Sequence, residues 1–207
     1  IISVRPEYLF SNTAHCLWGE MYGHDAEWLL QDVGKFKNAG IKVMGYLTSG
    51  YEGKGSSTGL DRWWYTLGMN KTLIRDMAEL DRVDGVFIDE CTAYPDDNSK
   101  KYLKELSSLA HYYGLIVWGN VGNSSFDPWY FTEGGFDFLN STEEWDGQDL
   151  TPVQKEWGSR LSVTTVDSSA SPFKVSRLSI DAWEKGLAYC YVTPSYLLLP
   201  SWIEESA

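Results

Sequence analysis

Two adjacent pairs of acidic residues stand where apolar runs of the chain end. Asp89 and Glu90 follow one run, Glu143 and Glu144 follow another, and Asn120 follows a third. An ionised group at the edge of a core is costly unless it has a partner or a function. Two carboxyl groups that meet in one cleft can supply the acid/base and nucleophilic steps of glycosidic bond cleavage. The acidic pairs therefore indicate a two-carboxylate site.

Aromatic side chains lie close to the same run ends in the sequence, among them Tyr46, Tyr51, Trp145 and Trp202. Carboxylates surrounded by aromatic rings are typical of a carbohydrate site. Each residue also has a more ordinary alternative role, because a carboxylate after a strand often caps the next helix and a single tryptophan more often belongs to the core. The Asp89-Glu90 pair is harder to explain in this way, since neighbours on a strand face opposite sides.

The composition excludes several classes of protein. The chain has 207 residues, 43% hydrophobic and 22% charged, as in a globular protein with a sizeable core. No apolar run approaches the roughly 20 residues that span a bilayer. A net charge of −12 disfavours nucleic acid as a partner. The three cysteines and three histidines lack metal-ligand spacing, so we expect no metal and no cofactor.

Short apolar runs alternate with amphipathic stretches, which is the pattern of successive βα units. The runs predict seven strands, near residues 2–5, 41–47, 85–89, 115–119, 136–142, 161–166 and 187–192. The amphipathic stretches predict helices over residues 25–38, 72–81, 99–112, 152–158 and 175–185. Regular alternation without a GxGxxG or GxxxxGK[ST] motif favours a (β/α)8 TIM barrel over a nucleotide-binding doubly wound sheet.

A closed barrel needs eight strands, so we expect the first βα unit to be missing or to precede Ile1. The sequence contains no linker, internal repeat or low-complexity tract, which predicts one domain over residues 1–207. In such barrels the chemistry lies at the carboxyl ends of the strands. The acidic pairs stand at those ends.

Five segments together resemble the spherulin-4-like family, which is related to the endo-α-1,4-polygalactosaminidases. They are Gly45-Tyr46-Leu47-Thr48 with Tyr51, Asp84-Gly85-Val86-Phe87-Ile88-Asp89-Glu90, Asn120-Val121-Gly122, Glu143 at a strand end, and Leu199-Pro200-Ser201-Trp202. The related enzymes are (β/α)-barrel glycoside hydrolases that cut polymers of galactosamine or N-acetylgalactosamine. The resemblance therefore implies an endo-acting glycoside hydrolase on such a barrel.

The resemblance also implies roles for the acids. Asp89 would be the nucleophile, Glu143 the general acid/base and Glu90 a supporting carboxylate, with Glu144 as the alternative to Glu143. Carboxyl groups about 5–5.5 Å apart lead to retention of configuration, whereas roughly 6.5–9.5 Å leaves room for water and leads to inversion. The sequence does not measure this separation, and we expect the retaining mechanism.

The same resemblance implies that Tyr46, Tyr51 and Asn120 line the sugar subsite and that Trp145 and Trp202 offer stacking surfaces. It further implies a polysaccharide partner, an extracellular or cell-surface location and a monomer. The acidic surface would attract a polymer that carries free amines. Two alternatives fit the same residues: a non-catalytic carbohydrate-binding barrel, and a glycosidase that acts on another α-glycan.

Overall fold

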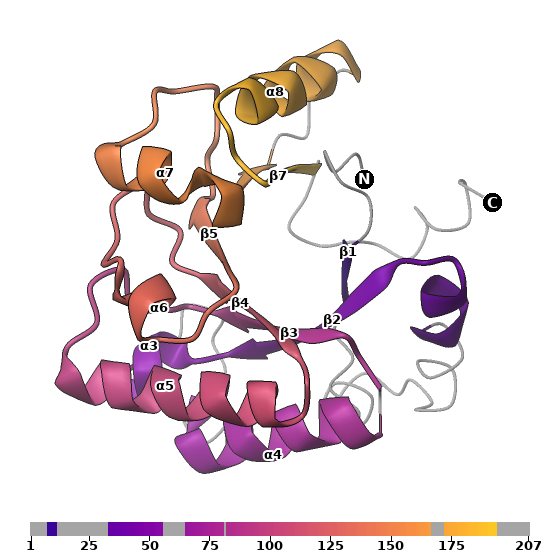
Figure 1. Ribbon diagram of the computed structural model, residues 1–207, viewed down its shortest axis with the longest axis vertical. Helices are drawn as coiled ribbons and strands as arrows, with labels where there is room; N and C mark the ends of the chain where they lie inside the picture. Colours follow the sequence, from indigo (N-terminus) through magenta and orange to yellow (C-terminus); the bar gives the residue numbers. More distant parts are fainter. Residues whose placement is uncertain (1–7, 12–32, 56–64, 81, 167–171, 194–207) are drawn as a thin grey trace.

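The computed structural model describes residues 8–11, 33–55, 65–80, 82–166 and 172–193, and its centre is a curved parallel sheet (Figure 1). The seven strands pair in sequence order, each parallel to the next. They are β1 (Tyr8–Ser11), β2 (Lys42–Thr48), β3 (Gly85–Asp89), β4 (Ile116–Asn120), β5 (Phe138–Thr142), β6 (Leu161–Val166) and β7 (Tyr189–Thr193). Within the described residues no strand joins β7 to β1, and the curved sheet has the form of a partial (β/α)8 barrel, as the sequence predicts.

Helices and helical turns follow the strands, and the longer helices lie along the outer side of the curved sheet (Figure 1). They are α3 (Gly50–Gly53), α4 (Leu67–Glu79), α5 (Asp97–Tyr112), α6 (Trp129–Thr132), α7 (Pro152–Trp157), the 3-10 turn η2 (Gly158–Arg160) and α8 (Pro172–Glu184), and residues 33–38 are also helical. Side-chain oxygens of Thr66, Asp96 and Thr151 accept backbone N–H groups at the starts of α4, α5 and α7. None of the described helices is long and apolar enough to cross a membrane.

The strands β2 to β7 lie within two residues of their predicted bounds at each end. The prediction at residues 2–5 falls outside the described residues, and β1 was not predicted. Helices α4 and α5 begin earlier than predicted, because Thr66 and Asp96 provide caps before the apolar periodicity becomes visible. The short elements α3 and α6 were missed, since four residues carry too little periodicity to reveal a helix.

Alternation along the strands builds two separate apolar clusters. Residues such as Val86, Ile88 and Val117 face the helices and belong to the main core. Their strand neighbours Phe87 and Trp118 face the other way. They belong to a smaller cluster inside the barrel, together with Met44, Ile116, Phe138, Ala188 and Tyr189. The inside of the barrel is therefore filled with aromatic and sulfur-containing side chains near the beginnings of the strands.

Two residues further along β3, β4 and β5 the inward side chains become polar. Asp89, Asn120 and Asn140 occupy these positions, and Asn120 pairs in register with Asn140, which pairs with Ser162 on β6. Because parallel strands end at the same edge of the sheet, these side chains converge above the aromatic cluster. The interior of the barrel is thus apolar near the amino ends of the strands and polar near their carboxyl ends.

Candidate active site at the carboxyl ends of the strands

Asp89, the last residue of β3, accepts three hydrogen bonds. The Tyr46 hydroxyl donates to Asp89 Oδ2 at 2.6 Å, while Asn120 Nδ2 and the backbone N–H of Glu90 donate to Oδ1 at 2.7 and 2.8 Å. Within the described part of the chain, no lysine, arginine or histidine forms an ion pair with Asp89 or with Glu143. Neutral donors alone therefore hold this carboxylate.

Asn120 joins Asp89 to Glu143. Its Nδ2 donates to Asp89 Oδ1 at 2.7 Å and to Glu143 Oε1 at 2.6 Å. Two oxygens bound to one nitrogen at these lengths lie no more than about 5.3 Å apart. Glu143 follows β5 and remains partly exposed, as does Asp89, whereas Asn120 is buried. The two partly exposed acids are therefore held close together by one buried amide. We call Asp89, Asn120 and Glu143 the Asn120 cluster.

The conformation of Glu90 explains how two adjacent acids can both lie at the carboxyl-end edge of the sheet. The strand ends at Asp89, and Glu90 takes a left-handed conformation with φ 55°, which is strained for a residue with a side chain. Alternation is thereby broken, and the buried Glu90 carboxylate accepts a hydrogen bond from the Thr48 hydroxyl of β2. Ser49 Oγ and the Tyr51 N–H donate to the Glu90 carbonyl at 2.8 and 2.9 Å. Backbone and side chain of Glu90 are both fixed.

Tyr46 is kept protonated by its surroundings. Burial raises the pKa of its hydroxyl far above the usual value, and the negative charge of Asp89 raises that pKa further. The hydroxyl therefore serves as a permanent donor to Asp89. Phe87 stacks against the Tyr46 ring with centroids 6.1 Å apart, which places the site directly on the aromatic cluster inside the barrel.

Gly122 permits the close approach of Glu143 to the loop after β4. Its φ of 54° lies in the left-handed region, and a Cβ there would sit 3.3 Å from the Glu143 carboxyl carbon. The N–H of Gly122 donates to Asn120 Oδ1 at 3.1 Å. The backbone of Gly122 therefore holds the Asn120 amide, and a side chain at position 122 would crowd Glu143.

A second layer of polar groups lies behind Asn120. Asn140 Nδ2 donates to Asn120 Oδ1 at 3.0 Å, while Ser162 Oγ and Thr164 Oγ1 donate to Asn140 Oδ1 at 3.1 and 3.0 Å. The Trp118 indole N–H donates to Ser162 Oγ at 3.1 Å. Hydrogen bonds thus connect the aromatic cluster to the two acids.

The turn after β2 places Tyr51 at the same edge. All four residues of α3 have positive φ, including Tyr51 at 49° and Glu52 at 58°, so the turn is left-handed. Tyr51 is 41% exposed. Glu52 anchors the turn, because its carboxylate accepts from Thr92 N at 2.9 Å and from Thr92 Oγ1 at 2.5 Å. Burial raises the pKa of the Glu52 carboxyl above its ordinary value.

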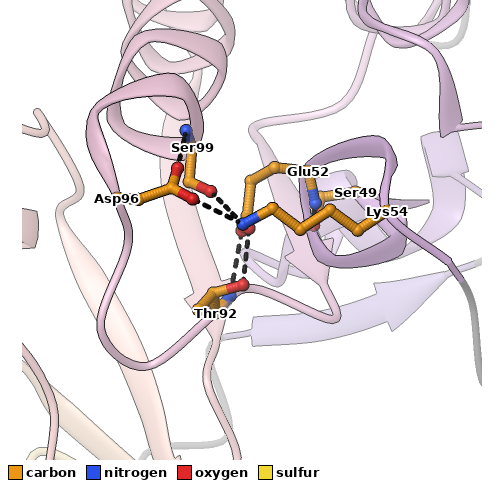
Figure 2. Close-up of polar contacts among 6 residues, drawn as sticks. All are labelled: Ser49, Glu52, Lys54, Thr92, Asp96 and Ser99. Atoms are coloured by element: carbon orange, nitrogen blue, oxygen red, sulfur yellow. Dashed lines mark hydrogen bonds and ion pairs between the residues drawn. The ribbon is translucent and has the colours of Figure 1, made fainter.

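Figure 2 shows the contacts that surround this anchor. Lys54 Nζ donates to Asp96 Oδ2 at 3.1 Å and to Ser99 Oγ at 2.9 Å, and Asp96 Oδ1 accepts from Ser99 N at 2.8 Å at the start of α5. These hydrogen bonds lower the pKa of Asp96 to about 2. We call the six residues drawn there, Ser49, Glu52, Lys54, Thr92, Asp96 and Ser99, the Glu52 cluster.

Two of the residues considered in the sequence, Trp145 and Glu144, do not join the site. Trp145 is fully buried in the main core, where its backbone N–H binds the Thr164 carbonyl at 2.9 Å, so the predicted stacking surface at Trp145 is wrong. Glu144 is exposed beside Glu143 and, among the described residues, forms no hydrogen bond with the Asn120 cluster. Trp202 lies outside the described residues.

Sequence reasoning missed two features of this edge. Asn140 lies inside β5, where an interior asparagine could have been noticed as unusual for a buried strand. Tyr94, in the loop after β3, is 60% exposed, and its hydroxyl is hydrogen-bonded to that of Ser125 in the loop after β4. Only the proximity of these two loops could have revealed Tyr94. In the described residues no group of three or more His, Cys, Asp or Glu is placed to hold a metal ion.

No protein-family model matches the sequence, and no curated protein matches it. Solved structures do resemble it. Aspergillus clavatus Sph3 in complex with GalNAc has a TM-score of 0.56 at 15% identity, over 82% of this chain and 70% of that one. Deoxyribose phosphate aldolase from Aeropyrum pernix has a TM-score of 0.52 at 11% identity, over 97% and 89%.

D-psicose 3-epimerase from Clostridium cellulolyticum H10, solved with D-tagatose, has a TM-score of 0.51 at 12% identity, over 93% of this chain and 76% of that one. At these identities the likeness concerns the fold alone. The aldolase and the epimerase are TIM-barrel proteins. The chain therefore has the fold of a partial (β/α)8 barrel, which it shares with Sph3.

Proposed function

We propose that this protein is an endo-acting glycoside hydrolase that cleaves α-1,4-linked galactosamine or N-acetylgalactosamine polymers with retention of configuration. The single observation that carries the proposal is the Asn120 cluster. Asp89 Oδ1 and Glu143 Oε1 share one amide nitrogen and lie no more than about 5.3 Å apart. This upper limit on the distance between the two nearest oxygens is compatible with the roughly 5–5.5 Å of retaining enzymes and lies below the roughly 6.5–9.5 Å of inverting ones.

The hydrogen bonds favour one assignment of roles. Donors stabilise the charged form of a carboxylate. Asp89 accepts three hydrogen bonds, which hold it in one orientation for attack, whereas Glu143 accepts one, from Asn120, so its second oxygen has no hydrogen-bond partner among the described residues and can reach the leaving group. Tyr46 and Asn120 are the donors that orient the nucleophile.

The reaction then has two steps. In the first, an Asp89 oxygen bonds to the anomeric carbon, the glycosidic carbon–oxygen bond breaks, and the Glu143 proton moves to the leaving oxygen. In the second, water attacks the anomeric carbon, one of its protons returns to Glu143, and the bond to Asp89 breaks. The two attacks occur on opposite faces, so the configuration is retained.

Charge and exposed rings support the substrate class. The net charge of −12 suits a sugar that carries a free amine. So does the site, because among the described residues no basic side chain pairs with Asp89 or Glu143. Tyr51 and Tyr94 present partly exposed rings at the carboxyl-end edge and replace the buried Trp145 as candidate stacking surfaces. Sph3, whose fold this chain resembles, was crystallised with GalNAc.

The test is hydrolysis of partially deacetylated α-1,4-galactosaminoglycan by the 207-residue protein, with products followed by mass spectrometry and NMR. We expect oligosaccharides whose new reducing ends first appear as the α-anomer. The first appearance of the β-anomer would contradict retention. Binding of the polymer without release of oligosaccharides would favour the non-catalytic barrel, and cleavage of a neutral α-glucan instead would favour the other glycosidase.

A further inference from the structure

We propose that Asn140 is a positioning residue, which determines which end of the Asn120 amide faces the two acids. The proposal deepens the proposed function and rests on it. An amide has two chemically opposite ends, an acceptor oxygen and a donor NH2 group. Catalysis by the Asn120 cluster requires the NH2 end to face the carboxylates, and something must prevent the amide from turning over.

The contacts of Asn120 separate the two ends completely. Its Nδ2 donates to Asp89 and Glu143, whereas its Oδ1 accepts from Asn140 Nδ2 at 3.0 Å and from Gly122 N at 3.1 Å. A turned amide would place its oxygen against two carboxylates and its NH2 against two donors. All four contacts would then be repulsive, so Asn140 and the Gly122 N–H together select one orientation.

The orientation of Asn140 is itself determined from below. The indole N–H of Trp118 can only donate, and it donates to Ser162 Oγ at 3.1 Å. The Ser162 hydroxyl has two acceptors in reach, Asn140 Oδ1 at 3.1 Å and the Leu139 carbonyl at 3.3 Å. Thr164 Oγ1 also donates to Asn140 Oδ1, at 3.0 Å, so the Asn140 oxygen faces these hydroxyls and its NH2 faces Asn120. The chain of donors therefore runs in one direction, from Trp118 to the two acids.

Burial makes this direction matter. Trp118, Asn140 and Ser162 are 2%, 4% and 5% exposed, so water cannot easily replace a lost partner. In such surroundings an unmatched polar group is costly and aligned hydrogen bonds reinforce one another. The orientation of Asn120 is thus fixed before any substrate arrives.

The decisive variant is Asn140→Asp, which keeps the shape of the side chain but removes its only donors. Ser162 and Thr164 can still donate to it, whereas Asn120 Oδ1 loses one of its two donors, keeps only the Gly122 N–H and faces a carboxylate. We expect kcat to fall by about 10²-fold, the lower end of what removal of one preorganised donor costs. We also expect the acidic limb of the pH–rate profile to move to higher pH, because the charged acids lose their shared donor.

The matched control is Gln154→Glu, which makes the same amide-to-carboxyl change at another buried position. Gln154 is 1% exposed and lies on α7, where its Nε2 donates to Ser141 Oγ and Thr142 Oγ1, both at 3.1 Å. It should lower thermal stability and leave the pH–rate profile of the folded fraction unchanged. Should Asn140→Asp fail to fold, Ser162→Ala breaks the chain one step earlier and should move the profile in the same direction by a smaller amount.

A second readout does not depend on hydrolysis. In ¹⁵N-labelled protein, the Asn120 side-chain NH2 resonances should follow the titration of the acids in the wild type and lose this response in Asn140→Asp. If the response is lost while no polymer is cleaved, the proposed function fails and the positioning role stands. If Asn140→Asp keeps kcat within twofold, the wild-type pH–rate profile or the NH2 response, the positioning role is wrong.

Discussion

The Asn120 cluster and the Glu52 cluster stand at the same edge of the sheet, and both are built around carboxylates. In the Glu52 cluster both acids have conventional structural roles, since Asp96 caps α5 and pairs with Lys54, and Glu52 holds the loop at Thr92. In the Asn120 cluster two acids share one neutral donor, and neither has an ion pair among the described residues. The hydrogen-bond and ion-pair partners of an acid, more than its position at a strand end, therefore distinguish a candidate catalytic acid from a structural one.

The two clusters are also connected. Ser49 Oγ accepts from Glu52 N at 3.3 Å and donates to the Glu90 carbonyl at 2.8 Å. Glu90 in turn donates its N–H to Asp89. The Glu52 cluster therefore braces the backbone that carries the Asn120 cluster, and substitutions in each should have separable effects.

The largest effect should follow from removing either acid of the Asn120 cluster. Asp89→Asn and Glu143→Gln keep side-chain volume but remove the charge or the proton, so each should lower kcat by at least about 10²–10⁴-fold. Thermal midpoints should change little. Glu90→Gln should be less harmful, because the buried Glu90 carboxylate accepts from the Thr48 hydroxyl and an amide oxygen can still accept there.

Turnover and thermal midpoint measured on the same samples check this prediction. An asparagine at position 89 can still accept the hydrogen bond from Tyr46. We therefore expect Asp89→Asn to fold, so that its loss of activity reports on the chemistry. Activity of Glu143→Gln within tenfold of the wild type would exclude Glu143 as the acid/base, and Glu144→Gln would be measured next.

A smaller effect should come from Tyr94, which lies in the loop after β3 and is hydrogen-bonded to Ser125 in the loop after β4. Tyr94→Ala should raise KM for long polymer about 2–10-fold with kcat unchanged, since an aromatic contact contributes about 0.5–1.5 kcal/mol. Tyr94→Phe should keep most of the affinity. The control is Tyr112→Ala, because Tyr112 is 80% exposed but ends α5, which runs back to the opposite edge of the barrel. Equal changes in KM for both alanine variants would refute a subsite at Tyr94.

Within the Glu52 cluster we expect stability to change and chemistry to persist. Asp96→Ala removes the acceptor for Ser99 N and the partner of Lys54, so the thermal midpoint should fall. Asp96→Asn retains a capping oxygen and should recover most of the loss. Differential scanning calorimetry and kcat per folded molecule test the contrast; a tenfold loss of kcat in Asp96→Ala would show that this cluster also serves the reaction.

The smallest effect is a difference in pH dependence between two acids of one cluster. The pKa of Asp96 is lowered from 3.8 to about 2, so its stabilising contribution is present above pH 3.8 and disappears as pH falls toward 2. The pKa of Glu52 is raised from 4.5 by burial, so the folded state binds its proton more tightly and this contribution grows as pH falls toward 4.5.

Thermal midpoints of Glu52→Gln and Asp96→Asn between pH 2 and 7 measure these contributions. The advantage of the wild type over Asp96→Asn should shrink below pH 4, and added salt should reduce it because Asp96 is exposed. The thermal midpoint of Glu52→Gln relative to that of the wild type should be highest at pH 7 and should fall as the pH is lowered toward 4.5. Parallel curves for the two variants would contradict the opposite signs.

The strand pattern and the acids at strand ends were predictable from the sequence because each depends on local order. Apolar runs locate the strands, and parallel strands bring Asp89, Asn120 and Glu143 to one edge. The sequence could not reveal that one amide nitrogen joins both acids, since this depends on the register of three strands and on Asn140. It also could not reveal that Trp145 turns into the core.

The left-handed turn of α3 implies that selection for thermal stability and selection for activity should favour different residues at position 51. Left-handed backbone costs roughly 1–2 kcal/mol for each residue with a side chain, and the turn holds two, Tyr51 and Glu52. Gly50 cannot change, because a Cβ there would lie 2.4 Å from the Tyr65 ring. A library screened for heat resistance alone should therefore accumulate glycine or asparagine at position 51, whereas one screened for growth on polymer should retain tyrosine, and sequencing both pools would reveal which demand formed this loop.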